Sequence, residues 1–497
     1  MRGRWVLVFV FTGLLAIQAA AQSESVVPTD KAVPQDRVGQ LEQLVTKLQQ
    51  RIEELEQKSQ VNKPAKEESE APADTGIEAL DQKLRILERN RELEQESFVA
   101  KAKEAPVVSA GEEGFSISNA DKSYRLRIGA QLQVDGKTFY DNRAHLVSNS
   151  FVVRRLRPTI EGSVGKYVDF RFMPDFGNGS TLIYDAYADL KYRPFAVLRA
   201  GKFKTPLGLE QLQSDADVTF IERSLATDLV PNRDEGFAIY GNIAKRVTYT
   251  AAVLNGAPVG QSIDGTTHNG KDVVGRVFAT PWATSGQKLL KGLGFGAAAS
   301  SGRQDQGVAL PSFKSTGGQA TFFSYLSTSA TAGHRLNYSP QLYYYNGPLG
   351  LLAEYTVSTQ KVSGPGATKG STLISEITDH AWQVSGSWLL TGESKSFGRL
   401  TPRRKFEGGN FGSGFGAWEL AARYSALTVD PKVFSLKLAD PTKSAEAARE
   451  WTVGLNWYLN KNVKVATDFE QTHFQHGAVI GNRPTEKAFE ERLQIAF

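Results

Sequence analysis

The sequence predicts an all-β transmembrane barrel of 16 or 18 antiparallel strands, preceded by an α-helical coiled-coil extension. From Phe115 onward, apolar and polar residues alternate in segments of about ten residues, the length that a tilted strand needs to cross a bilayer. In many segments one face is charged and the other is apolar and aromatic, as expected of strands between water and lipid. The chain also ends in an aromatic residue, Phe497. The alternating segments number about 17, and bacterial barrels close with an even number.

Composition leaves room for a large folded unit and excludes several kinds of site. The 497 residues are 40% hydrophobic and 22% charged, which excludes a disordered or collagen-like chain. The absence of cysteine excludes disulfides, thiolate metal sites and catalytic thiols, and six scattered histidines give no metal cluster. Residues 1–114 carry 15 Lys/Arg and 20 Asp/Glu (net −5), and residues 115–497 carry 43 and 33 (net +10). A basic C-terminal unit therefore follows an acidic N-terminal extension.

Residues 1–21 have the pattern of a secretory signal peptide. Arg2 and Arg4 form the positive region, residues 5–17 an apolar stretch too short to span a bilayer, and residues 19–21 a small-residue cleavage site. An uncleaved anchor is the alternative. Beyond this segment no run of 18 apolar residues occurs, so no transmembrane helix is expected. Export excludes a cytoplasmic protein and, with it, most nucleic-acid roles.

Residues 22–61 are predicted to form a coiled coil. Their apolar seam is spaced 3-4-3-4-3, as in a supercoiled helix. It consists of Val38, Leu41, Val45, Leu48, Ile52 and Leu55. A Pro- and Glu-rich linker spans residues 62–76, and a second short coiled coil or helix, residues 77–110, has a seam through Ile77, Leu80, Leu84 and Leu87. A lone amphipathic helix is the alternative, but so narrow a seam needs partner chains to bury it.

Residues 115–497 are assigned to the barrel. In residues 181–192 the alternation places Tyr184 on the apolar face and Asp185 and Asp189 on the opposite, polar face. A polar lumen wall explains such carboxylate pairs as well as catalysis would. The chain has no Gly-x-Ser-x-Gly elbow and no phosphate-binding Gly-rich loop followed by a helix. No enzyme activity, cofactor or metal is therefore predicted.

The segment around residues 151–162 is the strongest candidate site. Period-two alternation puts Arg155 and Arg157 on one face of a strand with Glu161, whereas Arg154 points the other way, near a strand end or a subunit contact. Two arginines on a lumen wall would attract anions and bind oxyanions through paired hydrogen bonds. The alternative is a structural ladder in which the arginines pair with Glu161, Asp169 or Asp185.

Motifs in order across nearly all of residues 115–497 resemble the phosphate-selective porin O and P family of bacterial outer membranes. They lie at residues 124–133, 201–210, 220–224, 390–393, 416–420, 454–458 and 463–465, with the pairs Arg154–Arg155 and Arg423–Tyr424. The resemblance implies a homotrimer of 16-stranded barrels, each with an inward-folded third loop between Lys204 and Glu235.

The resemblance also implies functional residues. Arg154, Arg155 and Arg199 fall where the family places basic constriction residues, and Asp175 falls near a lumen acid that offsets them. The loop region adds Lys204, Arg223 and Arg233, although Arg223 has the alternative of a salt bridge with Glu222 or Asp228. The chain departs from the family in two respects. Its acidic coiled-coil extension is not universal among members. Residues 301–320 offer only Arg303 and Lys314, where the most phosphate-specific members carry an arginine-dense stretch. This departure weighs against high phosphate selectivity.

The predicted function is an outer-membrane porin through which small anions, phosphate or polyphosphate among them, diffuse past a basic constriction. Its predicted partners are membrane lipid and two further copies of the chain, with the coiled coil in the periplasm. One alternative is a structural anchor whose coiled coil contacts the cell wall. Another is a secreted soluble β-protein that binds glycans through its aromatic residues.

Overall fold

The computed structural model describes residues 50, 74–104, 106–141, 146–265, 269–304, 310–368, 370–408 and 414–497. The chain divides into two units, residues 1–94 and 95–497. The predicted signal peptide lies outside the described residues, as do the first coiled-coil segment apart from residue 50 and most of the linker.

One long helix, α3 (Asp74–Glu104), covers most of the second segment that was predicted to be helical. Leu84 and Leu87 of its predicted seam are 55% and 66% exposed. The helix is shorter than predicted, since residues 107–111 form a strand. Pro106 explains the boundary, because proline lacks the N–H of a helical residue and disfavours helix in the residue before it. Among the described residues, no helix is long and apolar enough to cross a membrane.

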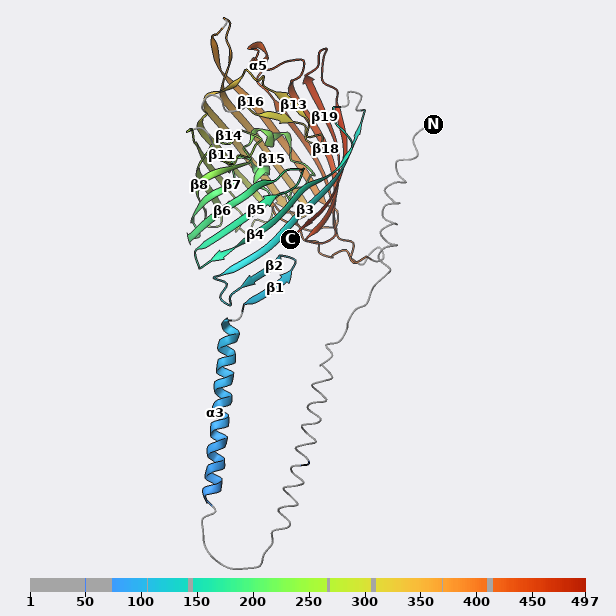
Figure 1. Cartoon of the computed structure of the whole chain (residues 1–497). Helices are drawn as coiled ribbons and strands as arrows, with labels where there is room; N and C mark the ends of the chain where they lie inside the picture. Colours follow the sequence, from blue (N-terminus) through green and yellow to red (C-terminus); the bar gives the residue numbers. More distant parts are fainter. Residues whose placement is uncertain are drawn as a thin grey trace, which may run out of the picture. The chain divides into compact units, whose positions relative to one another are not determined.

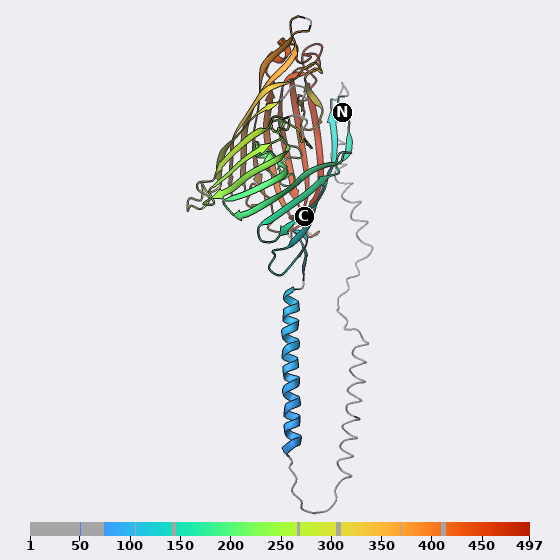
Figure 2. The ribbon, with the colours of Figure 1, turned by 60° about the vertical axis from the view of Figure 1, so that its left-hand side comes forward.

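The second unit is built on antiparallel strands that close into a barrel (Figure 1, Figure 2). Its first nine strands are β3 (Arg125–Tyr140), β4 (Ser150–Val164), β5 (Val168–Asp175), β6 (Leu182–Arg193), β7 (Ala196–Lys204), β8 (Arg233–Ile243), β9 (Val247–Leu254), β10 (Asp272–Ala279) and β11 (Leu293–Gln304). The others are β14 (Ala330–Asn346), β15 (Leu349–Pro365), β16 (Thr372–Leu389), β17 (Ala417–Thr428), β18 (Ala445–Tyr458), β19 (Val463–His476) and β20 (Glu486–Ala496).

Closure occurs between the first and last of these strands, since β20 pairs with residues 131–140 of β3. The other end of β3 pairs with β2 (Gly114–Ser118), which forms a hairpin with β1 (Val107–Gly111). The sheet therefore contains 18 strands, but without this hairpin 16 strands close the barrel. Of the two predicted strand numbers, 16 is confirmed.

Burial is inverted relative to a soluble protein. On β14, Arg335, Asn337 and Gln341 are at most 4% exposed, whereas the intervening Leu336 and Tyr338 are about 40% exposed (39% and 43%). The same alternation of buried polar and exposed apolar residues runs along β18, β19 and β20. A polar interior and an apolar outer face are what a strand between a lumen and lipid requires. This surface argues against a secreted soluble β-protein.

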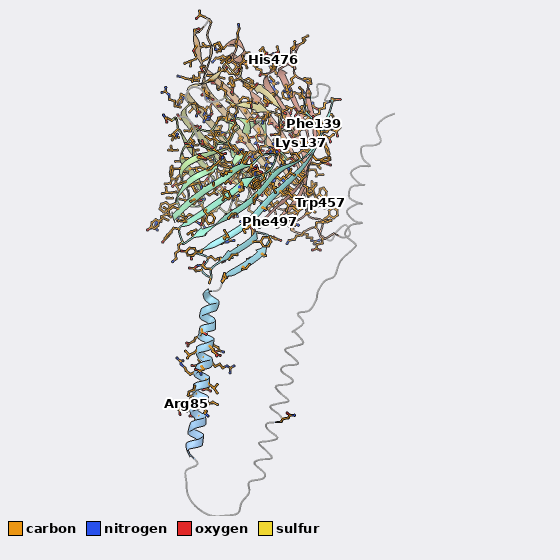
Figure 3. The ribbon with its side chains drawn as sticks, in the orientation of Figure 1. Arg85, Lys137, Phe139, Trp457, His476 and Phe497 are labelled. Atoms are coloured by element: carbon orange, nitrogen blue, oxygen red, sulfur yellow. The ribbon has the colours of Figure 1, made fainter. Side chains whose placement is uncertain are left out.

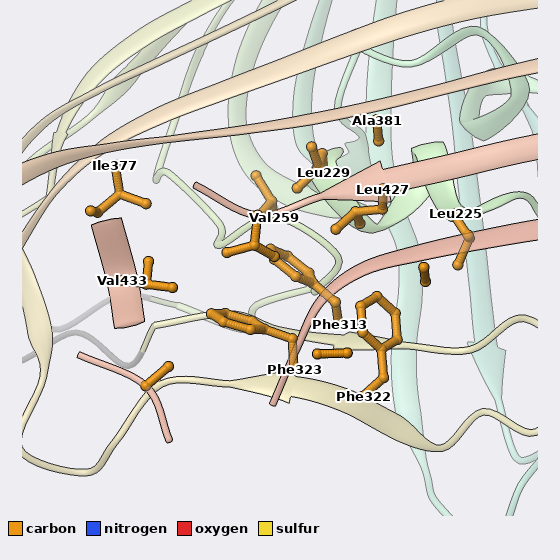
Figure 4. Packing of buried hydrophobic residues seen from close by; sticks show 14 of the residues in the cluster. Leu225, Leu229, Val259, Phe313, Phe322, Phe323, Ile377, Ala381, Leu427 and Val433 are labelled. Carbon is orange, nitrogen blue, oxygen red and sulfur yellow. The ribbon is translucent and has the colours of Figure 1, made fainter. Parts of the chain in front are cut away.

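Long connections at one end of the barrel fold inward and build an apolar cluster there (Figure 4). The connection between β7 and β8 contributes Leu225 and Leu229 from the 3-10 helix η1 (Leu225–Leu229). The hairpin of β12 (Ser312–Lys314) and β13 (Thr321–Ser324) contributes Phe313, Phe322 and Phe323, which are fully buried. The short helix α5 (Lys432–Ser435) adds Val433.

The same hairpin connection is also anchored to the barrel wall. Lys137 of β3, labelled in Figure 3, donates to the carbonyl of Gly317 at 2.7 Å and pairs with Glu490 of β20 at 2.6 Å. Glu486 accepts from Ser315 at 3.0 Å and from the backbone N–H of Gly318 at 2.8 Å. At the other end of the barrel, the connection between β16 and β17 reaches the lumen through Arg399, which donates to Asp217 at 3.1 Å.

Candidate functional site

The connection between β7 and β8, residues 205–232, crosses the lumen. It includes the short helix α4 (Leu209–Leu212) and is buried along most of its length. The barrel wall holds its backbone at several points. Glu354 accepts from the N–H groups of Leu209 and Glu210 at 2.7 and 3.2 Å, and Lys464 donates to the carbonyl of Val218 at 2.9 Å. It is the third connection at its end of the barrel, so the inward-folded third loop expected between Lys204 and Glu235 is present.

Four guanidinium groups converge on one carboxylate of this connection, Asp215. Arg157 of β4 donates to it at 2.5 Å, and Arg223 of the connection itself forms a second, short ion pair. Arg155 and Arg233 lie 3.6 and 3.8 Å from the same carboxylate. Burial alone would raise the pKa of Asp215, but the positive charges, Arg223 foremost, hold it well below its usual value. Asp215 is therefore ionised and serves as their shared counter-ion.

A second carboxylate, Glu222, lies near three arginines, one of which, Arg155, also lies near Asp215. Arg154 donates to it at 2.6 Å, and Arg492 of β20 and Arg155 lie 3.2 and 3.4 Å away. Burial would raise the pKa of Glu222, and these arginines, Arg154 foremost, lower it well below its usual value. Arg223 forms a salt bridge within the connection, as its alternative predicted, but with Asp215 and not with Glu222 or Asp228.

Arg154 faces the lumen, contrary to the sequence prediction. The register of β4 against β3 shifts at this point, since Arg155 lies opposite Gln133 while Val153 lies opposite Val134. Arg154 is thus the extra residue of a β-bulge, and a bulge breaks the period-two alternation from which its outward direction was predicted. Adjacent arginines consequently reach the same carboxylate.

Tyr184 is a second correction of the same kind. It was assigned to the apolar outer face, but β6 bulges at this residue, because Met173 of β5 lies opposite Asp185 and Pro174 lies opposite Ile183. Proline cannot donate a ladder hydrogen bond, so a bulge at Pro174 is expected. The Tyr184 ring lies between two guanidinium groups, 3.9 Å from that of Arg157 and 4.0 Å from that of Arg233.

The other predicted site residues divide into two groups. Asp175 accepts from Arg157 at 2.7 Å, Lys204 donates to the carbonyl of Gln213 at 2.6 Å, and Arg233 donates to Asp185 at 3.2 Å, so all of them join the network around Asp215. Arg199 does not join it. Arg199 makes two 2.8 Å bonds to Asp189 and stacks on Tyr187 at 3.7 Å.

The alternative to anion binding was a ladder of structural salt bridges, and the acidic partners that it predicted for Arg155 and Arg157 are wrong. Glu161 pairs with Arg127 and Arg171, and Asp169 pairs with Lys191, whereas Asp185 pairs with Arg233 and Arg171. Arg155 and Arg157 take their partners from the inward connection and from Asp175 instead.

Two cavities flank residues 214–217. The cavity of about 120 Å³ on one side is lined by Asp215, and that of about 370 Å³ on the other by Ser214, Ala216 and Asp217. The charged residues lining the smaller one, hereafter the arginine cavity, are Arg154, Arg155, Arg223, Arg233, Lys314, Asp215, Glu222 and Asp228. Five are cationic and three are acidic, and burial raises the pKa of Asp228 to about 7. This cavity therefore carries an excess of positive charge at neutral pH.

The chemistry of this site is that of anion recognition. Guanidinium groups present paired N–H donors that match the geometry of phosphate and carboxylate oxygens. Over the part of the chain that the structure describes, no group of three or more His, Asp or Glu residues could hold a metal ion.

Comparison with known proteins identifies the family. The model of the family described as phosphate-selective porin O and P matches residues 126–497, about three-quarters of the chain. The chain belongs to this family. Its location is therefore the bacterial outer membrane. Porin O of Pseudomonas aeruginosa is 24% identical to this porin over 436 residues, which are 79% of this chain and 93% of that protein.

Two solved structures are more distant. OmpT of Vibrio cholerae, folded in vitro, is 11% identical, with a TM-score of 0.46 and coverage of 76% of this porin and 98% of that chain. The high-pH structure of OprB from Pseudomonas putida is 10% identical, with a TM-score of 0.45 and coverage of 76% and 95%.

Sequence reasoning did not assign Asp215, Glu222, Tyr184 or Arg492 to the network. Asp215 and Glu222 lie in a connection with no periodicity, and Tyr184 had been placed on the wrong face. The motif at residues 220–224 was a signal for Glu222, and the density of acidic residues at 210–217 was a weak one for Asp215.

Proposed function

We propose that this porin passes small anions by passive diffusion, with phosphate and polyphosphate among its solutes, and that the arginine cavity sets its selectivity. The observation that carries the proposal is the convergence of Arg155, Arg157, Arg223 and Arg233 on the single carboxylate of Asp215. Cations concentrated beside a water-filled constriction raise the local concentration of anions and discourage cations. Arg154, Lys204 and Asp175 complete the proposed set.

Arg199 is a weaker member of the proposed set. Two of its three guanidinium nitrogens, Nε and Nη2, are already bonded to Asp189, which leaves less of its charge for a passing anion. We therefore propose Arg154, Arg155 and Arg157 as the dominant residues of β4, with Arg223 and Arg233 beside them.

We further propose a homotrimer with its N-terminal extension in the periplasm. The family resemblance and the exposed leucines of α3 support this assembly, since an isolated helix of this length gains most of its stability from a partner. The rival is a structural anchor in which the coiled coil contacts the cell wall. In that case the barrel would hold the protein in the membrane without conducting.

The test is the zero-current potential across a planar bilayer holding the full-length protein under a potassium chloride gradient. The expected sign is anion-selective, with an anion-to-cation permeability ratio of about five or more. A cation-selective potential would contradict the proposal. Folded protein, recognised by a heat-shifted band on a denaturing gel, that gave no conductance would favour the anchor.

A further inference from the structure

The carboxylate of Asp215 lies among guanidinium groups, as the phosphate or carboxylate of a bound ligand would. Each polar contact it makes within the described residues is to a guanidinium, and no backbone N–H donates to it. Asp175 differs, because one of its oxygens also accepts from the N–H groups of Leu156 and Gly177 at 3.2 and 2.9 Å. Asp175 is thus fixed to the barrel wall, whereas only ion pairs hold the side chain of Asp215.

The backbone beneath Asp215 is anchored. Gln133 donates to the carbonyl of Asp215 at 3.1 Å, and Gln494 donates to that of Ala216 at 2.8 Å. Residues 214–217 also separate the two cavities, with the carboxylate itself on the arginine side. The carboxylate of Asp215 can therefore leave the guanidiniums by movement of the Asp215 side chain alone.

We propose that Asp215 is a resident counter-ion that a permeating oxyanion displaces from the four guanidiniums. This inference rests on the proposed function and names the ligand class of the same site. The oxyanion must present two or more oxygens, as inorganic phosphate does, because Arg155 and Arg223 lie against one carboxylate oxygen of Asp215 and Arg157 and Arg233 lie against the other. Chloride is a single atom and cannot replace two carboxylate oxygens at once, so it competes poorly with the carboxylate of Asp215.

Displacement has a consequence for transport. An empty cluster of arginines would hold phosphate tightly and release it slowly, whereas conduction requires binding weak enough to permit exit. With Asp215 present, the energy of binding phosphate is reduced by the energy of removing the carboxylate. The counter-ion thus weakens binding while it preserves the preference for oxyanions.

The test measures inhibition of chloride current by inorganic phosphate in planar bilayers for the wild-type porin, Asp215→Asn and Asp217→Asn. Asp217 is the matched control, since it lies two residues away in the same wall, faces the other cavity and bonds to Arg399. In Asp215→Asn the half-inhibitory phosphate concentration should fall about tenfold, as expected when a competing charged hydrogen bond is removed. In Asp217→Asn it should change less than about twofold. Equal shifts in the two variants would overturn the proposal, because they would indicate only a general change of charge.

The double variant Asp215→Asn/Arg223→Gln separates displacement from net charge, and it also removes the risk of leaving Arg223 unpaired. This double variant has the same net charge as the wild type. If Asp215 acted only through its charge, the half-inhibitory phosphate concentration of the double variant would therefore equal that of the wild type. Displacement instead requires a half-inhibitory concentration several-fold lower, about threefold or more. Wild-type inhibition in this variant, or failure of both variants to give a heat-shifted folded band, would overturn the proposal. A cation-selective wild-type potential would contradict the proposed function itself, so the two failures are distinct.

Discussion

Two walls of the lumen differ in the charged residues that cluster on them and in what lies in front of them. The wall formed by β4 to β8 carries Arg154, Arg155 and Arg233, which line the arginine cavity, and Arg157, which adjoins it through its ion pair with Asp215. The wall formed by β18 to β20 carries Glu450, Asp468, Glu470 and Glu490, all at most 1% exposed. Over this acidic wall lies the connection between β11 and β14, whose Gly317 packs against Glu470. Charge on a lumen wall therefore affects passing ions only where a cavity reaches it, and a count of lumen charges from sequence misses this difference.

The largest effect should follow from neutralising the basic wall. Arg155→Gln/Arg157→Gln removes two of the four guanidiniums around Asp215, and we expect the anion-to-cation permeability ratio to fall about tenfold. The zero-current potential in a potassium chloride gradient measures this ratio. Glu470→Gln/Glu490→Gln is the control on the wall that the connection between β11 and β14 covers. A comparable shift in that control would remove the distinction between the walls.

Substitutions in the acidic wall should change the stability of the porin rather than its selectivity. Neither carboxylate oxygen of Glu470 has a hydrogen-bond partner, although the side chain is 1% exposed. An unpaired buried polar group destabilises a protein by about 1–3 kcal/mol, more when charged, so Glu470→Leu, which removes both carboxylate oxygens, should raise the free energy of unfolding by a similar amount. Denaturant titration of the heat-shifted band measures this free energy. Glu450, which accepts from Arg423 at 3.1 Å, is the contrasting position, and Glu450→Leu should destabilise. Stabilisation of both would mean that hydrogen bonding does not explain the difference.

A smaller effect, dependent on pH, should come from Asp228 of the arginine cavity. Burial raises its pKa to about 7, with Lys314 opposing the shift and Glu450 adding to it. Ionisation between pH 6 and pH 8 adds one negative charge to the cavity, so the anion-to-cation ratio should fall by about twofold in potassium chloride. Asp228→Asn should abolish this change.

The same group makes a prediction for stability. Because the pKa of Asp228 is higher in the folded state than in the unfolded state, the folded state binds more protons between about pH 4 and pH 7. The contribution of Asp228 to stability therefore falls as pH rises through this range and is constant above it. A stability that rises with pH in the wild type but not in Asp228→Asn would contradict the assigned shift.

Alternation was enough to predict the barrel and its polar interior. It also gave two candidate strand numbers, 16 and 18, of which 16 is right. It failed at Arg154 and Tyr184, because a β-bulge inserts one residue and reverses the direction that parity assigns to it. It also gave no information on Asp215 and Glu222, since the inward connection has no period and its side chains are placed by contacts distant in sequence. Arg154, Arg155, Arg157 and Arg233 lie on strands and were predicted, whereas Asp215 and Glu222 lie in the connection and were not.

Arg199 supplies the smallest expected effect and the sharpest test of how the basic wall works. The family resemblance puts it among the constriction residues, yet its guanidinium donates twice to Asp189 and also contacts Tyr240 at 3.2 Å. An arginine neutralised by its own bidentate carboxylate contributes little net field, whereas the arginine cavity is lined by five cationic and three acidic residues. Arg199→Gln should therefore change the permeability ratio by less than about 1.5-fold, against about tenfold for Arg155→Gln/Arg157→Gln. If Arg199→Gln alone shifted the zero-current potential as far as that double variant, selectivity would depend on the number of arginines along the wall. The excess of cationic over acidic residues at the arginine cavity would then not be the cause of selectivity.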